Sequence, residues 1–502
     1  MANLFSVIES ALSAVPEKTI LQSLDGQRMS AAQLLEASDR MAAILVQQGV
    51  LPGDRVSVQV DKDFLNVVLY LGVLKAGAAY LPLNSGYTDD EIDYFLSDAT
   101  PRVHVCTTPR AESAQAIAQR LSDTRVETLD LDGGTLRAAF ERQTQGLGAS
   151  VPRAPSDLAS ILYTSGTTGK PKGAMLTHQN LTANAQMLTQ AWEYSSADAL
   201  LHALPLFHVH GLFVALNLAL VNAGAVVLLP KLDIDDVMQA MPLCTVMMGV
   251  PTYYTRLLSD SRFDRAAAEH MRLFISGSAP LLVETSNEFF ERSGHRILER
   301  YGMTETGMSC SNPLHGERRA GSVGPALPGV QARVMDEQGA ELPRGEVGSL
   351  QVKGDHVFAG YWNLPEKTAS EFTQDGFFIT GDMATQSSDD YVSIVGRGKD
   401  LVISGGLNIY PKEIEDVLND IDHIVESAVV GVPHADFGEG IVAVLVCSGE
   451  IDLAAVEAIC RKKLAAFKLP RSWHIVDALP RNTMGKVQKN LLRSEYAADF
   501  TG

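Results

Sequence analysis

The sequence predicts a two-part α/β protein: a large N-terminal α/β part, with parallel or mixed sheets covered by helices, and then a small α+β part. Its 502 residues are more than a single hydrophobic core usually organises. Apolar strands alternate with helical segments up to Arg397, as in parallel sheets. Beyond Arg397 the elements become shorter, and about a hundred residues remain, which is enough for a separate domain.

The alternation of strands and helices begins near the N-terminus. Ser30 and Gln33 have the spacing of a capping box, which predicts the start of an amphipathic helix that ends at Gly49. Segments 55–60 and 78–83 are predicted to be buried strands. Because a helical segment connects them, we expect these two strands to run parallel.

Three later strands end where a ligand site is expected. The strand 160–164 ends at a glycine-rich loop, and the strand 245–250 ends at a helix that begins with Pro251. The strand 273–277 ends at the segment SAPLLVET. In such sheets the ligand crevice forms beyond the carboxyl ends of the strands, so these three loops are expected to line it.

The sequence places the boundary between the two parts after Arg397, giving residues 1–397 and 398–502, with a hinge near Lys399. The C-terminal part has the mixed pattern of an α+β unit. Its expected elements are a helix over 411–418, strands over 427–432 and 441–446, a helix over 453–465 and a strand over 472–479.

Charge and composition exclude several classes of protein. A net charge of −19 makes nucleic acids and acidic membranes unfavourable partners. The N-terminus has no basic region and Glu9 interrupts its apolar run, so no signal peptide is expected. No stretch has the roughly 20 uninterrupted apolar residues that span a bilayer. The five scattered cysteines are typical of a reducing compartment, and the cytoplasm is the expected location.

One region carries the opposite charge. Between Arg461 and Arg493 there are nine Lys or Arg side chains and one acid, Asp477. Such a run indicates either a solvated face or an anion site for a polyphosphate ligand, and the sequence leaves both open. The nine are Arg461, Lys462, Lys463, Lys468, Arg471, Arg481, Lys486, Lys489 and Arg493.

The strongest chemical signal is the segment YTSGTTGKPKG, residues 163–173. Its three glycines let the backbone approach an anion, its four hydroxyl side chains surround that anion with donors, and two lysines add positive charge. Pro171 follows Lys170, so this is not a Walker A loop. The loop follows a buried strand and is expected to lead into a helix capped at Thr177, which argues against a mobile surface loop.

With this loop, eight motifs in order make the chain resemble the adenylate-forming superfamily, which includes acyl- and aryl-CoA synthetases, luciferase and peptide-synthetase adenylation domains. Within it the chain is most similar to the members that activate malonate. The resemblance implies a small β subdomain, a mobile C-terminal part, and ATP, Mg²⁺ and coenzyme A as ligands. The motifs are YTSGTTGKPKG, PLFHVHGL (205–212), ISGSAPL (275–281), ERYGMTET (299–306), TGD (380–382), GRGKDLVISGG (396–406), NIYPKEIE (408–415) and PRNTMGK (480–486).

The resemblance also assigns a nucleotide site. It makes Thr304 an α-phosphate donor, Glu305 a Mg²⁺ ligand together with the phosphates, and Asp382, with Arg397, the partner of the ribose. Taken alone, these residues would more often be a helix cap and turn residues. The full ATP and AMP set is Thr164, Ser165, Gly166, Thr167, Thr168, Gly169, Lys170, Lys172, Gly277, Ser278, Ala279, Pro280, Glu299, Arg300, Tyr301, Gly302, Met303, Asp382 and Arg397.

Two further assignments concern the C-terminal part. The resemblance places Lys486 beside the substrate carboxylate and the α-phosphate during adenylation, where a fixed positive charge stabilises the transition state. The C-terminal part then rotates about Lys399, which removes Lys486 and brings Gly405 and Gly406 to the pantetheine channel. Taken alone, Lys486 is an exposed lysine. Its exposed loop also suggests that a lysine-acylating regulator could switch the enzyme off there.

The acyl pocket is expected to form from HALPLFHVHGL, TYYTRLL and SGSAP. If Arg256 is buried among the apolar residues of TYYTRLL, its guanidinium needs an anion. Malonate keeps a second carboxylate after the first is activated, and Arg binds carboxylates bidentately. From the residues alone, Arg256 could instead pair with a structural acid or lie on the outside of its helix. The resemblance favours a buried Arg256 that binds the free carboxylate of malonate. Ser276 would add a hydrogen bond, His208 would lie beside the activated carboxylate, and His202 and His210 would be structural.

The predicted reaction is malonate + ATP + CoA → malonyl-CoA + AMP + PPi. A carboxylate oxygen attacks the α-phosphate, which is mainly a matter of positioning and charge neutralisation, and the thiol then attacks the acyl-adenylate. Three alternatives remain open: a CoA ligase for methylmalonate or another short acid, an enzyme that loads a carrier protein, and a non-catalytic scaffold.

Overall fold

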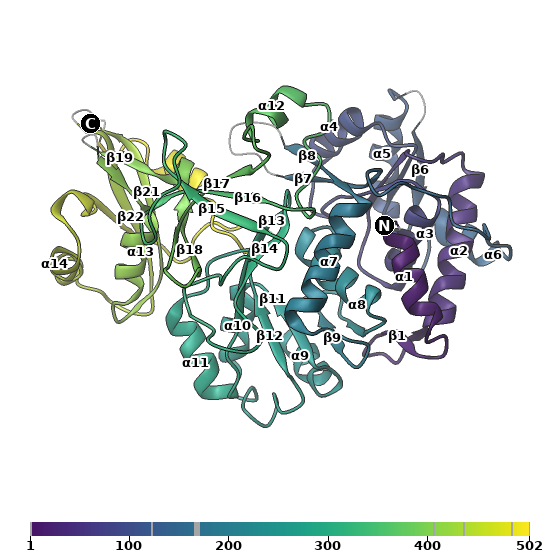
Figure 1. The fold of residues 1–502 in the computed structure, drawn as a ribbon, viewed down its shortest axis with the longest axis horizontal. Coiled ribbons are helices and arrows are strands. Elements are labelled where there is room, and N and C mark those ends of the chain that lie inside the picture. The colour runs from purple at the N-terminus through teal and green to yellow at the C-terminus, as the bar shows by residue number, and fades with distance from the viewer. Residues whose placement is uncertain are drawn as a thin grey trace.

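The part of the chain that the structure describes contains four β-sheets and the helices that pack on them (Figure 1). The computed structural model describes residues 3–121, 124–164, 171–404, 407–434, 437–482 and 485–500, apart from the side chain of Asn408. In these ranges no helix is both long and apolar enough to cross a membrane.

The first sheet is six-stranded and mostly parallel. Val56 lies opposite Tyr80 on one side and Val103 on the other, so the two strands predicted near the N-terminus run parallel, as expected. Only the last strand, β8, runs antiparallel to its neighbour. The strand order is β6 (Arg125–Thr128), β5 (Val103–Cys106), β3 (Arg55–Gln59), β4 (Ala79–Pro82), β7 (Leu158–Thr164) and β8 (Lys172–Thr177).

The second sheet is eight-stranded and has a parallel centre. Gly249, Ser276 and Glu299 lie in register on three neighbouring strands, so the carboxyl ends of these strands meet at one edge. The strand order is β14 (Gly307–Ser311), β13 (Leu298–Met303), β12 (Leu273–Ser276), β11 (Val246–Gly249), β9 (Ala199–His202), β10 (Ala225–Leu228), β1 (Thr19–Gln22) and β2 (Arg28–Ser30).

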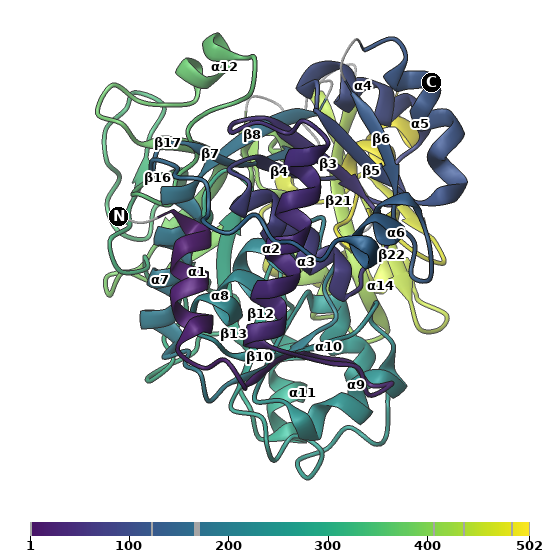
Figure 2. The same ribbon diagram turned by 90° about the vertical axis from the view of Figure 1, so that its right-hand side faces the viewer.

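Helices cover these two sheets. α2 (Ala31–Gln47) begins with the predicted capping box between Ser30 and Gln33. α3 (Phe64–Lys75) is buried on nearly all sides, as expected for a helix inside a large protein, and α1, α2 and α3 lie side by side in Figure 2. The others are α1 (Leu4–Ser13), α4 (Asp89–Ala99), α5 (Ala111–Ala118), α6 (Thr135–Arg142), α7 (His178–Trp192), α8 (Asn217–Val221), α9 (Ile234–Ala240), α10 (Pro251–Leu258) and α11 (Val283–Ser293).

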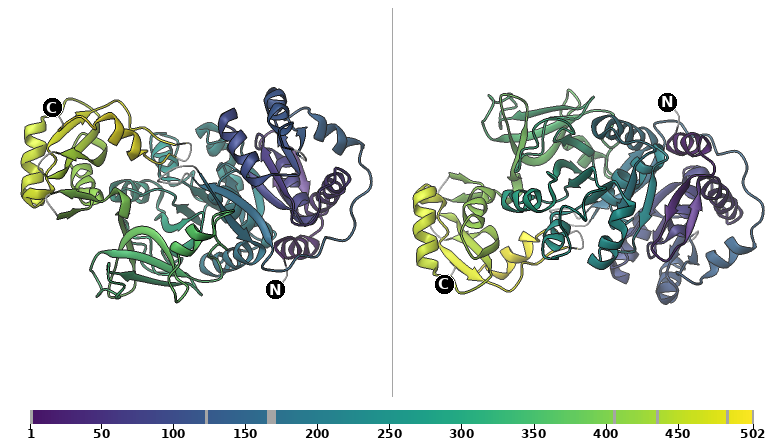
Figure 3. Two further views of the ribbon diagram at one scale, coloured as in Figure 1. Left: turned by 90° about the horizontal axis from the view of Figure 1, so that it is seen from above. Right: turned by 90° about the horizontal axis from the view of Figure 1, so that it is seen from below.

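Two smaller sheets follow. The third is antiparallel, carries α12 (Pro365–Ser370), and is the expected small β subdomain. The fourth lies in the C-terminal part, which occupies one end of the molecule in both views of Figure 3. The strands of the third sheet are β15 (Gln331–Met335), β16 (Gly348–Lys353), β17 (Phe378–Gln386) and β18 (Val392–Arg397). The elements of the C-terminal part are β19 (Val402–Ser404), β20 (Leu407–Ile409), α13 (Pro411–Asn419), β21 (Ile424–His434), β22 (Gly438–Cys447), α14 (Leu453–Lys463), β23 (Ser472–Ile475) and α15 (Lys489–Glu495).

The helix capped at Thr177 follows the glycine-rich loop as predicted, but one strand before it was not predicted. β8 lies between the loop and this helix and pairs antiparallel with β7, with Tyr163 opposite Gly173. The cap itself is confirmed: the Thr177 hydroxyl accepts from the backbone N–H of Asn180 at 3.1 Å. The loop therefore connects the two strands of a hairpin.

Six histidines, five of them buried and His208 half-buried, predict that acid destabilises the protein. Burial lowers the pKa of His104, His178, His208 and His356 from 6.5 to about 4, lowers the pKa of His202 to about 3, and lowers the pKa of His210 well below 6.5. Between pH 6.5 and 4 the unfolded chain takes up protons that the native chain does not. The free energy of unfolding should therefore decrease as the pH is lowered through this window, by up to about 1.4 kcal/mol per histidine and pH unit.

Thermal unfolding at pH 7, 6 and 5 checks this prediction. The unfolding temperature should fall progressively from pH 7 to pH 5. A constant value across this range would mean that these histidines are not held neutral in the folded protein.

Candidate active site

The candidate site lies at the carboxyl ends of β11, β12 and β13. The segment that carries His208 borders this edge and continues into a π-helix, His210–Leu216, a form that is frequent at functional sites. His202 is structural, as expected, because its Nε2 lies 2.8 Å from the backbone oxygen of Gly211. His208 accepts at Nδ1 from the backbone N–H of His210 at 3.2 Å.

A buried guanidinium without an acid partner lies at the centre of this edge. Arg300, on β13, is 3% exposed, and its Nε and Nη2 atoms have no hydrogen-bond partner. No acid among the residues that the structure describes forms an ion pair with it, and burial lowers the pKa of Arg300 to about 9. It lies flat against Gly277, where an added Cβ would be only 2.3 Å from Nη1. Gly277 therefore makes room for Arg300.

Two more unpaired polar atoms belong to the same neighbourhood. The hydroxyl of Ser276, which is 1% exposed, and Nε2 of the fully buried His210 have no hydrogen-bond partner. Nδ1 of His210 lies 3.3 Å from the hydroxyl of Ser278. The charge of Arg300 contributes to lowering the pKa of His210, so these two side chains lie near each other. Buried polar groups are normally paired, so an unpaired guanidinium near an unpaired imidazole, with an unpaired hydroxyl on the adjacent strand, indicates a site for an anionic ligand.

The expectation that Arg256 is buried is wrong. Arg256 lies in the last turn of α10 and is exposed. It is four residues from Thr252 and therefore on the same face of the helix. Thr252 faces the C-terminal part, since a Cβ placed on Gly485 would lie 3.2 Å from its Oγ1. Arg256 is thus at the edge of the junction between the two parts, and the sequence alone did not give the rotation of α10 about its axis.

The residues expected to bind the ribose do lie together. Arg397 Nε and Asp382 Oδ1 are 2.7 Å apart, and Asp382 is 3% exposed. The hydroxyl of Tyr301 donates to the other oxygen of Asp382. Tyr301 and Arg300 are neighbours on β13 and so point to opposite faces of the strand. β13 thereby places Tyr301 beside Asp382 and Arg397 on one face, and Arg300 near His210 on the other.

Glu305 lies in the turn between β13 and β14. It is 5% exposed, burial raises its pKa, and its Oε1 accepts a hydrogen bond of 3.0 Å from the hydroxyl of Tyr361. The described residues contain no group of three or more His, Cys, Asp or Glu side chains that could hold a metal ion. Thr304 lines a small pocket with Val209, Phe213 and His356.

Lys486 extends from the C-terminal part toward the Asp382 cluster. Desolvation, together with the charge of Arg397, lowers the pKa of Lys486, while Asp382 opposes this shift. Because its side chain still reaches solvent, the desolvation is partial. The two parts therefore meet with a lysine of one beside an Asp–Arg pair of the other.

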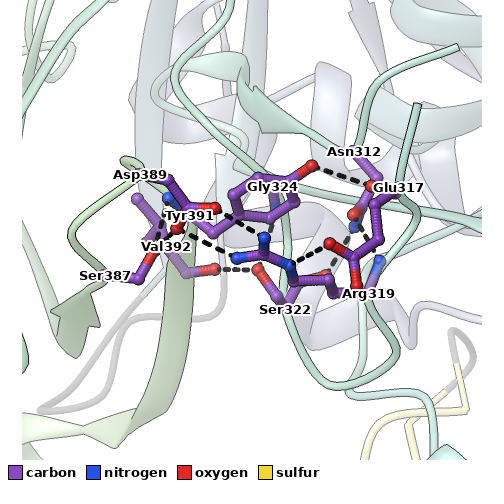
Figure 4. Close-up of polar contacts among 9 residues, drawn as sticks. All are labelled: Asn312, Glu317, Arg319, Ser322, Gly324, Ser387, Asp389, Tyr391 and Val392. Atoms are coloured by element: carbon purple, nitrogen blue, oxygen red, sulfur yellow. Dashed lines mark hydrogen bonds and ion pairs between the residues drawn. The ribbon is translucent and has the colours of Figure 1, made fainter. Parts of the chain in front are cut away.

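Arg319 connects the loop after β14 to the turn between β17 and β18. Its guanidinium donates to both carboxylate oxygens of Asp389, at 3.0 and 2.5 Å, and to Glu317 at 2.9 Å (Figure 4). It also lies 3.9 Å from the ring centroid of Tyr391, whose hydroxyl donates to the backbone oxygen of Glu317. This contact joins the small β subdomain, which supplies Asp382, to the edge of the eight-stranded sheet.

The basic stretch near the C-terminus is mostly neutralised. Six of its nine cations form ion pairs with acids, so the interpretation as an open anion site is not favoured. The pairs are Arg461–Glu457, Lys463–Asp420, Lys468–Glu413, Arg481–Glu426, Lys489–Glu415 and Arg493–Asp400.

Several predicted site residues lie outside the described residues, namely Ser165, Gly166, Thr167, Thr168, Gly169, Lys170, Gly405 and Gly406. Thr164 and Lys172, at the two ends of the glycine-rich loop, are described. Sequence reasoning did not predict that Nε2 of His210 and two nitrogens of the Arg300 guanidinium are buried without a hydrogen-bond partner. The alternation of β13 could have indicated that Arg300 and Tyr301 face opposite ways, but not which face is buried against Gly277.

Together, the fold and this site define an enzyme of the adenylate-forming class. The chain belongs to the AMP-binding enzyme family, whose model matches residues 8–362, and the model of the AMP-binding enzyme C-terminal domain matches residues 413–486. It is accordingly an AMP-forming acid–thiol ligase that uses ATP and CoA as substrates.

Two relatives and two crystal structures show how similar the chain is to individual members of the family. A malonate–CoA ligase of Arabidopsis thaliana is 33% identical over 98% of this chain and 89% of its own length. A long-chain-fatty-acid–CoA ligase of Bacillus subtilis is 32% identical over 98% and 94%. The ATP-bound crystal structure of MatB from Rhodopseudomonas palustris is 51% identical, covers 99% of both chains and superimposes with a TM-score of 0.96; its apo structure gives 0.85. The structure therefore superimposes more closely on the ATP-bound structure than on the apo structure.

Proposed function

We propose that the protein is an ATP-dependent malonate–CoA ligase, which forms malonyl-CoA, AMP and pyrophosphate through a malonyl-adenylate. The observation that carries this proposal is the buried, unpaired guanidinium of Arg300, with the unpaired Ser276 hydroxyl on the adjacent strand. Relatives of similar identity act on different acids, so the choice of acid depends on this site.

The charge of Arg300 decides between a diacid and a fatty acid. An aliphatic chain in the pocket would leave a desolvated guanidinium without a partner, which is strongly unfavourable. The free carboxylate of malonyl-adenylate would neutralise it and could also accept from the Ser276 hydroxyl. His208, which burial keeps neutral at pH 7, would lie beside the carboxylate that is activated.

The proposed nucleotide site uses residues that the structure brings together around the same edge. Asp382 and Arg397 would hold the ribose, Gly277 to Pro280 would flank the adenine, and Thr304 would donate to the α-phosphate. Lys486 would balance the charge that develops during attack by the carboxylate. We propose that the phosphate loop, residues 164–172, holds the β- and γ-phosphates.

Glu305 fits the expected Mg²⁺ ligand. It supplies one buried carboxylate, and Mg²⁺ is usually held by one or two carboxylates together with phosphate oxygens and water. When bound, the ion would neutralise phosphate charge.

The second half-reaction is proposed to use another arrangement of the two parts. Residues 398–502 would rotate about Lys399, withdraw Lys486, and bring Gly405 and Gly406 to the channel for the CoA thiol. An assay with free CoA as the acceptor tests this step. Thioester formation with free CoA supports the CoA ligase, and its absence would favour a carrier protein as the acceptor. We also propose a cytoplasmic location, which suits the five free cysteines, four of which are buried.

A pyrophosphate-release assay with a panel of acids tests the proposed substrate. Malonate should be turned over with a much higher kcat/KM than butyrate, and methylmalonate should fall between them. Butyrate used as well as malonate would contradict the assignment of Arg300. AMP formation with none of the acids would instead favour a non-catalytic scaffold.

Substitution of Arg256 should have a small effect. Because Arg256 is exposed, its contact with a substrate carboxylate would be screened by water and worth roughly 1 kcal/mol or less. Arg256→Leu should therefore lower kcat/KM for malonate by no more than about fivefold. A loss of several hundredfold would mean that this guanidinium, rather than Arg300, holds the free carboxylate.

Acylation of Lys486 is proposed to inactivate the enzyme, because it removes the positive charge needed for adenylation. Stoichiometric acetylation at Lys486 should abolish malonate-dependent pyrophosphate release, and deacylation should restore it. Full activity of the acetylated protein would contradict this regulation.

A further inference from the structure

The side chain of Tyr361 joins two carboxylates from distant parts of the sequence. Its hydroxyl lies 3.0 Å from Glu305 Oε1 and 2.6 Å from Glu371 Oε2. Tyr361 is 3% exposed and Glu305 is 5% exposed, so water competes little for these contacts. A phenol carries one proton and therefore donates to one carboxylate at a time. The other carboxylate still lies within hydrogen-bond distance of the same oxygen.

The second carboxylate continues the connection to the phosphate loop. Glu371 Oε1 lies 3.3 Å from Nζ of Lys172, and the same ammonium lies 4.1 Å from the ring centroid of Tyr361. Lys172 is the first residue of β8, directly after the glycine-rich loop. The ring of Tyr361 and the carboxylate of Glu371 thus hold Lys172 from two sides.

The backbone around Tyr361 is anchored to the same two places. Gly360 O accepts from Met175 N at 2.9 Å, and Trp362 N donates to Gly173 O at 2.8 Å, so this segment pairs with β8. Phe358 N donates to the backbone oxygen of Glu305 at 2.7 Å. Tyr361 therefore stands on a segment that is bonded to both the metal-ligand turn and the base of the phosphate loop.

We propose that Tyr361 is a positioning residue of the ATP site, whose hydroxyl fixes the carboxylate of Glu305 relative to Lys172 and the phosphate loop. This inference rests on the proposed Mg²⁺ role of Glu305. Groups that orient a metal ligand determine how well the ligand binds, and their loss typically lowers metal affinity or activity about 10- to 100-fold. The effect belongs to adenylation, because the thiol step does not use Mg²⁺-bound ATP.

Isothermal titration calorimetry without any acid tests the proposal independently of turnover. Tyr361→Phe removes the hydroxyl and keeps the ring beside Lys172. It should weaken binding of MgATP by about tenfold or more, while binding of ATP in the presence of a chelator changes by less than about twofold. Thioester formation from supplied malonyl-adenylate should be unchanged.

Tyr70→Phe is a matched control, because it also removes a buried tyrosine hydroxyl. That hydroxyl donates a hydrogen bond of 3.0 Å to Asn217 Oδ1, between helices α3 and α8. Tyr70→Phe should leave both ATP affinities unchanged. Glu371→Gln provides a second variant in case Tyr361→Phe does not fold; it should weaken MgATP binding by about threefold, because its pair with Lys172 is partly exposed.

Equal loss of MgATP and chelated ATP binding, or no loss of either, would overturn the positioning role of Tyr361. These measurements use no acid substrate. Failure of the Tyr361 proposal is therefore distinguishable from failure of the malonate assignment.

Discussion

Lys486→Ala should abolish adenylation and preserve thioester formation. Replacement of Lys486 removes the positive charge that the C-terminal part presents beside Asp382 and Arg397. Loss of one preorganised charge stabiliser typically costs about 10²- to 10³-fold in rate. Malonate-dependent exchange of pyrophosphate into ATP measures the first half-reaction, and conversion of supplied malonyl-adenylate to malonyl-CoA measures the second.

Lys462→Ala is the matched control, since Lys462 is an exposed lysine of the same part, in the last turn of α14. It should leave both half-reactions intact. If Lys486→Ala reduced both half-reactions equally, the proposed exchange of Lys486 out of the site before thiol attack would be wrong.

Arg300→Met should nearly eliminate malonate activation and stabilise the protein. Removing one partner of a buried, hydrogen-bonded charge pair costs roughly 3–5 kcal/mol, so kcat/KM for malonate should fall by about 10²- to 10⁴-fold. Butyrate, which has no second carboxylate, should lose little or gain. In the free enzyme the variant removes a buried charge without an acid partner, and the unfolding temperature should rise.

Three measurements on the same pair of proteins check this. Kinetics with malonate and butyrate give the change in selectivity, and thermal unfolding gives the stability. Added malonate and ATP should raise the unfolding temperature of the wild type more than that of the variant. An unchanged ratio of kcat/KM between the two acids would show that Arg300 does not contact the free carboxylate.

Much of the fold was predictable, because strong local signals agree with the final structure. The capping box at Ser30, the helix that begins at Pro251 and the parallel pairing of segments 55–60 and 78–83 all follow from local sequence. The strand β8 was missed, because its six residues become a strand only by pairing with β7 and with residues 359–362.

The site was less predictable, since burial of a side chain depends on contacts distant in sequence. The requirement for an unpaired, buried guanidinium was inferred from chemistry, yet Arg300 meets it and Arg256 does not. The difference arises because Gly277 lets Arg300 pack against the neighbouring strand, whereas α10 turns Arg256 toward the junction. Tyr361 and Glu371 had no sequence signal, because their roles depend on Glu305 and Lys172.

The ion pairs of the basic stretch have a mechanical consequence. Each of the six paired cations finds its acid within residues 398–502, so the proposed rotation would carry both partners of every pair along. All six pairs would stay intact, and none would have to exchange partners during the rotation. The C-terminal part would then turn as one stiff body, and the occupancy of the nucleotide and thiol sites, rather than a rearrangement of its own ion pairs, would determine which face it presents.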